Sequence, residues 1–202
     1  MPPAEGGGME ITMEELKERI LREGKVIGND ILKVDSFINY QVDPVLMAHI
    51  GDNFAEYFKD KGITKIITIE SSGIAPALMT ANAMGIPMVI LKKQPSKELN
   101  NNTFQTQVTS FTTRKEYELC LSADVISSDD HVLIIDDFLA DGEAVTGAIR
   151  LVRMAHATVA GIGILIEKSF QPGYQKLKSQ GFDIHSLVKI KDMDQYQITF
   201  TE

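Results

Sequence analysis

Apolar runs and helix-spaced apolar positions alternate along most of this chain. The runs Thr64–Ile69, Val132–Ile135 and Val159–Ile166 are short and rich in β-branched residues, which is typical of strands buried on both faces of a parallel sheet. A segment with helical spacing begins at Asp43-Pro44, where Asp is a favoured N-cap and Pro suits the first helical position. The alternation predicts an α/β fold with a mainly parallel, twisted sheet flanked by helices.

The same patterns predict the remaining elements. Thr12–Glu15 has the sequence of a capping box, which predicts a helix that ends at Gly24. The helix that begins at Asp43 is expected to stop at Gly62. Further helices are predicted at Ala75–Met84, Ala144–Met154 and Tyr174–Gln180. Further strands are predicted at Ile31–Val34, Met88–Leu91, Thr106–Thr113, Lys115–Ser122 and Ile184–Ile190, with a last one after Gln195, and Pro95–Gln107 is predicted to be a polar loop.

Residues 9–202 are expected to form a single domain, because a chain of this length suits one α/β core. Residues 25–40 are irregular with strand-like pieces and would form, with the C-terminal strands, a small hood rather than an independent domain. Residues 1–8 are rich in Pro and Gly and have no apolar pattern, which predicts a disordered tail outside the fold.

Composition excludes several classes of function. The net charge of −8 argues against a nucleic-acid partner, which would require a basic face. No apolar run approaches the length of a membrane span, and no secretory signal pattern is found, so we expect a cytoplasmic protein. The single cysteine, Cys120, is predicted to be a buried, inert thiol. The four histidines show no metal-ligand spacing, and His49 is expected to be a packing residue.

The strongest candidate for chemistry follows the run Val132–Ile135. Two adjacent carboxylates, Asp136 and Asp137, are followed by a short loop with Gly142 and then by the helix expected from Ala144. Helix amides bind phosphate, while carboxylates accept hydrogen bonds from sugar hydroxyls or hold Mg²⁺. A ligand with both a phosphate and a ribose diol would bind the helix amides through its phosphate and the carboxylates through its diol. One alternative is that the two acids only end a strand; another is a phosphatase-like protein with Asp136 as nucleophile.

The segment Val132–Ala144 resembles the phosphoribosyl-pyrophosphate (PRPP) binding signature of the type I phosphoribosyltransferase family. The usual loop of that family carries threonines, whereas this chain has Ala140-Asp141-Gly142-Glu143-Ala144. This loop is similar to Ala-Asn-Gly-Gln-Ala, which is found in the xanthine-specific branch. The resemblance implies that Asp136 and Asp137 are catalytic and hold the ribose, that residues 140–144 bind the 5′-phosphate, and that Mg²⁺ binds mainly through PRPP. The side chains of Asp141 and Glu143 would either point to solvent or repel the phosphate.

A second predicted strand-to-helix loop suits the pyrophosphate of PRPP. Residues 70–73 follow the strand Thr64–Ile69, and small residues let the backbone approach a charged group closely. The resemblance implies that Ser71, Ser72 and Gly73 bind this part of PRPP. Lys92 and Lys93 end the next strand, where two cations suit the pyrophosphate oxygens, and we assign this role to Lys92. An ordinary turn and a solvated strand end are the alternatives. The predicted hairpin after the polar loop would close over PRPP and exclude water.

The base would be recognised by the segment Glu167–Gly173. Its sequence, Glu-Lys-Ser-Phe-Gln-Pro-Gly, is similar to the purine-specificity loop of the xanthine-specific branch. Lys168 would donate to a carbonyl oxygen of an oxo-purine, and Leu32 and Asn39 match base-contacting positions. Asn39 as a loop cap is equally compatible with the sequence, and Phe170 would pack either on the base or in the core.

The resemblance implies a purine-salvage transferase that uses xanthine and PRPP and forms a homodimer. Besides the phosphatase-like protein with Asp136 as nucleophile, two alternatives remain open at this point. One is a preference for guanine or hypoxanthine. The other is a PRPP-binding regulator without catalysis, which the acidic charge and the lack of a DNA-binding domain disfavour.

Overall fold

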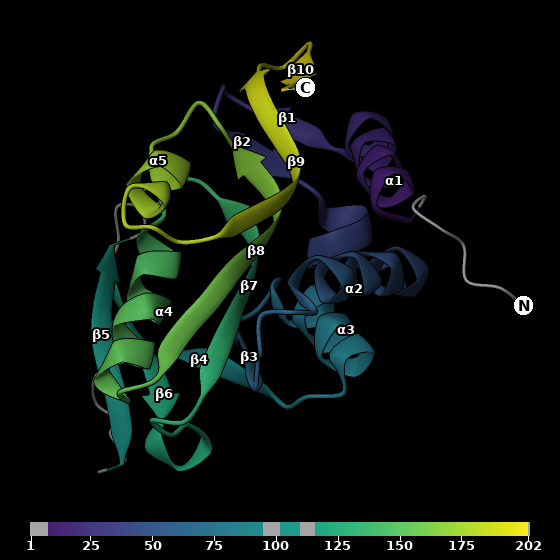
Figure 1. The fold of residues 1–202 in the computed structure, drawn as a ribbon. Helices are drawn as coiled ribbons and strands as arrows, with labels where there is room; N and C mark the ends of the chain where they lie inside the picture. Colours follow the sequence, from purple (N-terminus) through teal and green to yellow (C-terminus); the bar gives the residue numbers. More distant parts are fainter. Residues whose placement is uncertain (1–7, 95–101, 110–115, 202) are drawn as a thin grey trace, which may run out of the picture.

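The computed structural model describes residues 8–94, 102–109 and 116–201 (Figure 1). Its main feature is an eight-stranded sheet in the order β10-β9-β8-β7-β3-β4-β6-β5, and β1 and β2 form a separate antiparallel hairpin. The strands are β1 (Lys25–Ile27), β2 (Ile31–Lys33), β3 (Lys65–Ile69), β4 (Met88–Gln94), β5 (Thr103–Thr109), β6 (Glu116–Ser122), β7 (His131–Leu139), β8 (Thr158–Lys168), β9 (Ile184–Met193) and β10 (Ile198–Phe200). The helices are α1 (Gly8–Glu23), α2 (Pro44–Phe58), α3 (Ile74–Met84), α4 (Glu143–Met154) and α5 (Gly173–Lys178), with a short π-helical turn at Asp35–Asn39 and a 3-10 turn at Ala123–Val125.

The predicted fold class is confirmed. Strands β4, β3, β7, β8 and β9 are parallel neighbours, while β6, β5 and β10 pair antiparallel at the two edges. Helix α4 lies on one side of this sheet, and α2 and α3 lie on the other (Figure 1). Each side has its own apolar core, because the central strands bury side chains on both faces.

The central strands extend further than predicted. β7 continues to Leu139 and β8 to Lys168, so Asp136 and Lys168 lie within strands rather than after them. Main-chain pairing is the reason: Leu139 is still in register with Glu167 of the neighbouring strand. Backbone hydrogen bonds continue a ladder whether or not the side chains are apolar. β4 likewise runs through Lys92 to Gln94.

Two other predicted boundaries, the starts of α1 and β5, also differ from the structure. Helix α1 begins at Gly8, so the predicted capping box at Thr12 does not start it. Residues 1–7 of the predicted tail lie outside the described ranges. Strand β5 begins at Thr103, inside the predicted polar loop, because it pairs with β6 along its whole length. The predictions for residues 95–101 and 110–113 also lie outside the described ranges.

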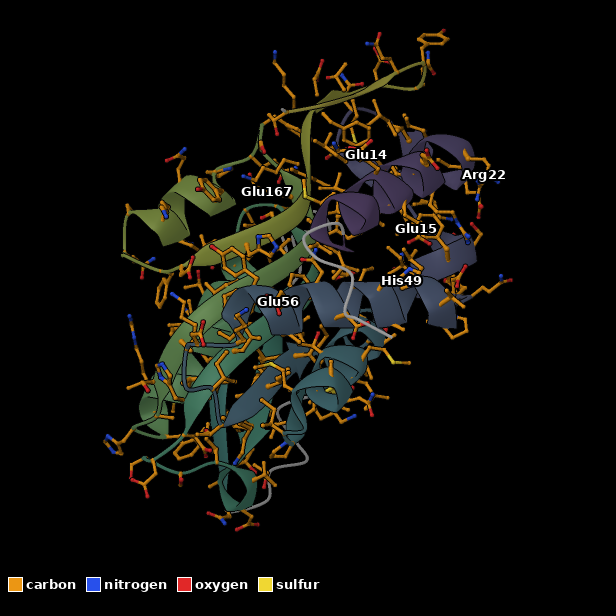
Figure 2. The ribbon with its side chains drawn as sticks, turned by 45° about the vertical axis from the view of Figure 1, so that its right-hand side comes forward. Glu14, Glu15, Arg22, His49, Glu56 and Glu167 are labelled. Atoms are coloured by element: carbon orange, nitrogen blue, oxygen red, sulfur yellow. The ribbon has the colours of Figure 1, made fainter. Side chains whose placement is uncertain are left out.

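Helix α2 confirms its predicted start. The Asp43 carboxylate accepts hydrogen bonds from the N–H groups of Val45 (3.0 Å) and Leu46 (3.2 Å). On the same helix, His49 is exposed, and its Nδ1 lies 2.8 Å from Glu15 Oε2 on α1 (Figure 2). His49 was predicted to be a packing residue, and its exposed position beside Glu15 shows that this prediction was wrong. Cys120 is buried, as expected.

The N-terminal elements lie beside the C-terminal end of the sheet (Figure 1). Leu16 of α1, Leu32 of the β1–β2 hairpin and Phe37 share one core with Leu187 and Met193 of β9. This packing places the hairpin above the ends of β7 and β8, where the candidate site is found. None of the helices in the described ranges combines the length and apolar character needed to span a bilayer.

Candidate active site

Two adjacent carboxyl groups lie near the carboxyl end of β7. Asp136 is only 6% exposed, and its Oδ1 accepts a hydrogen bond from the Asp137 N–H (3.1 Å). Burial, followed by the neighbouring charge of Asp137, raises the pKa of Asp136 well above its ordinary value, and burial also raises the pKa of Asp137. Two like charges in this position are costly without a ligand, so the geometry favours a functional role over a simple strand end.

The loop between β3 and α3 lies directly against this pair. A Cβ added at Gly73 would lie 3.1 Å from Asp136 Oδ1 and 2.3 Å from Thr68 Oγ1, so only glycine allows this approach. Gly73 precedes α3, and no side chain caps that helix. Ser71 is exposed, Ser72 is partly exposed, and the Glu70–Ser71 peptide bond is cis. The predicted loop and the acid pair are therefore brought together.

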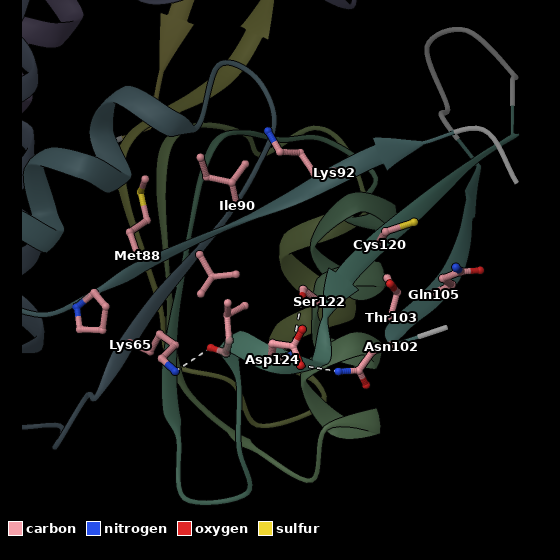
Figure 3. A pocket seen from close by; sticks show the side chains of 13 residues that line it. Lys65, Met88, Ile90, Lys92, Asn102, Thr103, Gln105, Cys120, Ser122 and Asp124 are labelled. Carbon is pink, nitrogen blue, oxygen red and sulfur yellow. Dashed lines mark hydrogen bonds between the residues drawn. The ribbon is translucent and has the colours of Figure 1, made fainter. Parts of the chain in front are cut away.

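The two lysines of β4 point to opposite sides of the sheet, as successive strand residues do. Lys93 Nζ lies 5.2 Å from the centre of the Tyr117 ring, and its charge lowers the pKa of both Asp136 and Asp137. Lys92 lies along the other face with Met88, beside a cavity of about 610 Å³ (Figure 3). The structure thus brings Lys93 towards the acid pair and leaves Lys92, the lysine preferred from sequence, on the far face.

The Glu70 carboxylate connects β4 to the loop between β3 and α3. Glu70 Oε1 accepts a hydrogen bond from the Lys93 N–H (2.5 Å), and Glu70 Oε2 lies 3.4 Å from Lys92 Nζ. The loop at residues 70–73 and the lysine pair therefore form one connected unit, although only one of the lysines faces the acids.

The loop at residues 140–144 forms the sharp entry to α4. Gly142 has a φ of +79°, which favours glycine, and its carbonyl oxygen accepts the Thr146 hydroxyl (2.7 Å). Asp141 Oδ1 accepts a hydrogen bond from the Glu143 N–H (3.0 Å). Glu143 forms an ion pair with Lys176 of α5. Neither acidic side chain is simply directed to solvent: Asp141 accepts a hydrogen bond from the loop backbone, and Glu143 is paired with Lys176.

Tyr117 of β6 faces the same acidic surroundings. Burial, followed by the charges of Asp136, Asp141 and Glu143, raises the pKa of Tyr117 to about 12. The hydroxyl therefore keeps its proton at any physiological pH and can act only as a neutral hydrogen-bonding group.

The candidate base site lies at the end of β8. Lys168 is 8% exposed, its Nζ donates to the Asp30 carbonyl oxygen (2.5 Å), and it lies 5.3 Å from the centre of the Phe138 ring. Burial lowers the pKa of Lys168, and the charges of Asp30 and Asp137 oppose that effect. Asp30 belongs to the turn between β1 and β2, so Lys168 connects the hood to the acid pair.

The other residues predicted for the base are placed differently. Leu32 is buried in the same hairpin, two positions after Asp30. Asn39 is exposed at the end of the π-helical turn, and its N–H donates to the Val34 carbonyl oxygen (3.3 Å). Phe170 is 40% exposed, which excludes a core role for this side chain.

The model of the phosphoribosyl transferase domain family matches residues 39–193 of this chain. The chain belongs to the phosphoribosyltransferase family. It is 70% identical to a xanthine phosphoribosyltransferase from Agathobacter rectalis over 94% of this chain and 99% of that protein. It is 57% identical to xanthine phosphoribosyltransferase 1 from Clostridium botulinum, over 94% and 100%. Among solved structures, adenine phosphoribosyltransferase from Rhodothermus marinus matches with a TM-score of 0.73 at 23% identity, over 90% and 99%, which shows the shared type I fold.

This phosphoribosyltransferase also contains a buried carboxylate beneath the candidate base loop. Glu167 is 3% exposed and accepts hydrogen bonds from the hydroxyls of Ser169 and Ser186, both at 2.6 Å. Ser169 follows Lys168, and its N–H donates to the Ile190 carbonyl oxygen (2.9 Å). The network therefore holds the backbone that carries Lys168.

Three residues near the site were missed from the sequence, namely Tyr117, Glu167 and Lys176, and Lys92 was preferred to its neighbour Lys93. Strand alternation could have separated Lys93 from Lys92. Tyr117 and Lys176 become neighbours of the phosphate loop only through the register of the hairpin and the position of α5, which no local pattern specifies.

Proposed function

We propose that this phosphoribosyltransferase transfers the phosphoribosyl group of PRPP to xanthine, giving xanthosine 5′-monophosphate and pyrophosphate in purine salvage. The observation that carries the base assignment is Lys168, a buried ammonium group at the end of β8 between the hood and the acid pair. The identity of 70% to a curated xanthine phosphoribosyltransferase supports it.

Transfer would proceed by positioning and electrostatics. Asp136 and Asp137 accept hydrogen bonds from the ribose hydroxyls and stabilise the positive charge that develops at C1′. Their raised pKa values fit a site in which a ligand supplies the missing partners. The amides of the loop at residues 140–144 would bind the 5′-phosphate at the start of α4, where the helix dipole favours an anion, apart from the Glu143 N–H, which the Asp141 carboxylate engages.

Pyrophosphate would leave from the loop that abuts Asp136. Ser71, Ser72 and Gly73 present the backbone to it at the uncapped start of α3. Of the two lysines at the end of β4, Lys93 would bind pyrophosphate most directly, because it lies on the face of the acid pair, and Lys92 would add positive charge from beside Glu70.

Mg²⁺ fits the donor set of this site. Adjacent carboxylates supply the oxygen ligands that Mg²⁺ prefers, and Mg²⁺ commonly combines one or two carboxylates with substrate phosphates and water. Within the described parts of the chain, no three His, Cys, Asp or Glu side chains gather into a metal cage. When bound with PRPP, the ion would neutralise charge on the leaving pyrophosphate.

Xanthine suits the base end because it offers carbonyl oxygens and is partly anionic near neutral pH. Lys168 would donate a hydrogen bond to one of these oxygens. An aminopurine would instead turn its exocyclic amino group, a donor, towards the Lys168 ammonium group, which is also a donor. Leu32 would contact the base from the hairpin, and Asn39 would offer an amide to its edge. We also propose a homodimer, a cytoplasmic location and a single domain over residues 9–202.

The test is a purine panel. The protein is incubated with PRPP and Mg²⁺ and with xanthine, guanine, hypoxanthine or adenine, and both pyrophosphate and the nucleotide product are quantified. We expect the highest kcat/KM with xanthine. A higher value with guanine or hypoxanthine would overturn the base assignment alone. Measurable PRPP binding with no product from any purine would favour the regulator.

A further inference from the structure

The 5′-phosphate loop of this protein carries two acids where a phosphate must bind. Asp141 and Glu143 flank Gly142 at the start of α4. A phosphate dianion placed there meets like charge unless each carboxylate is engaged elsewhere. The Asp141 carboxylate is engaged within the loop, on the Glu143 N–H (3.0 Å). The partner of the Glu143 carboxylate comes from a different element.

That element is α5, which packs directly on the loop. The Gly173 N–H donates to the Ala140 carbonyl oxygen (2.9 Å). A Cβ added at Gly173 would lie 2.4 Å from that oxygen and 2.8 Å from the Gly142 nitrogen. Backbone contacts this close fix the start of α5 relative to the loop, so the position of the side chains that follow is also fixed.

Lys176 projects from this anchored helix onto Glu143. Its Nζ pairs with Glu143 Oε1, and the two side chains are 37% and 34% exposed. Lys178 lies on the same helix and is exposed on its outer side. Lys176 is therefore the lysine of α5 that is placed to neutralise the loop.

We propose that Lys176 is a positioning residue of the 5′-phosphate site: it neutralises and holds the Glu143 carboxylate, so that an acidic loop can accept the phosphate of PRPP. This inference rests on the proposed function of that loop. Without the Lys176 ammonium group, Glu143 becomes an unpaired charge one residue from the phosphate-binding amides, and PRPP affinity falls. The chemical step at C1′ is unaffected, because Lys176 touches no reacting atom.

The test compares Lys176→Met, Glu143→Gln, the double variant and, as a matched control of equal charge change, Lys178→Met. With xanthine saturating, we expect Lys176→Met to raise the KM for PRPP about tenfold, with kcat within about twofold of the parent protein. Glu143→Gln should lower that KM. In the double variant the KM should return close to the parent value, and in Lys178→Met it should stay there.

An unchanged KM in Lys176→Met, or a double variant as poor as Lys176→Met, would overturn the inference. If Lys176→Met does not fold, Glu143→Gln alone decides, since a raised KM would contradict the proposed repulsion. Calorimetric titration with PRPP repeats the comparison without turnover. Calorimetry also separates this inference from the proposed function. If the variants bind PRPP with the expected differences but no phosphoribosyl transfer to xanthine is detected, only the proposed function is refuted.

Discussion

Asp130 and Asp136 lie near opposite ends of β7 and are almost equally buried, at 8% and 6% exposed. Burial alone would raise the pKa of Asp130, but hydrogen bonds from Lys65, Ser127 and Thr64 hold it below the ordinary value. The pKa of Asp136 is raised by burial and by the charge of Asp137. Part of the difference is depth, because Asp136 is enclosed more deeply in the interior than Asp130. The other part is the partners: those of Asp130 outweigh the effect of burial, whereas the Asp137 N–H and the charge of Lys93 do not outweigh it at Asp136, where we propose that a ligand binds.

The two carboxylates should therefore respond oppositely to pH. An aspartate with a lowered folded pKa stabilises the fold above its unfolded pKa, and that stability is lost as the pH falls through the folded value. An aspartate with a raised folded pKa destabilises the fold progressively as the pH rises from about 4 towards the raised value, because the unfolded chain ionises first.

The largest effect is expected from Asp136→Asn. Loss of the charge that we propose faces C1′ should lower kcat/KM with PRPP by about a thousandfold or more. Removal of the buried charge should raise the melting temperature at pH 7.5 by about 3 °C. This gain should vanish towards pH 4. Activity assays measure the loss of kcat/KM, and thermal unfolding across pH 4–8 measures the change in melting temperature. A variant that is fully active and less stable than the parent would contradict the contrast between Asp136 and Asp130.

Asp130→Asn is the matched variant at the other end of β7. Loss of its charged hydrogen bonds to Lys65, Thr64 and Ser127 should cost about 1–3 kcal/mol of unfolding free energy at pH 7.5. The loss should shrink as the pH falls towards 4. Denaturant unfolding measures it, and kcat/KM at a permissive temperature should stay within about threefold of the parent. A stabilised Asp130→Asn variant would remove the contrast.

The smallest effect is expected from Tyr117→Phe. The pKa of Tyr117 is raised to about 12, so its hydroxyl is a neutral group beside Asp136. Asp130, in contrast, is paired with the cation of Lys65. Its removal should raise the KM for PRPP by only about two- to fivefold. The pH profile of kcat/KM between pH 6 and 10 should keep its shape. Loss of a basic limb from that profile would mean that the tyrosine ionises in the working range.

The part of the site that sequence could predict is the part that is local in the chain. Asp136, Gly142 and the start of α4 follow one another along a strand, a turn and a helix, and the structure has them in that order. Lys168 was likewise found from a contiguous segment, and its position against the hood follows from the packing of Leu32 in the shared core.

The part that could not be predicted depends on strand register and helix placement. Lys65 becomes the partner of Asp130, and Ser186 the partner of Glu167, only when β3, β7, β8 and β9 are aligned. The ends of β7 and β8 were placed too early because backbone pairing continues past the last apolar side chain.

The most direct test of the proposed base is competition. Equal concentrations of xanthine and guanine are offered with limiting PRPP and Mg²⁺, and the nucleotides formed are separated and counted, for the parent protein and for Lys168→Met. We predict that xanthosine 5′-monophosphate predominates with the parent protein, and that its share falls by about tenfold or more relative to the guanine product in the variant. A guanine product that predominates with the parent protein, or a product ratio that Lys168→Met leaves unchanged, would contradict the account.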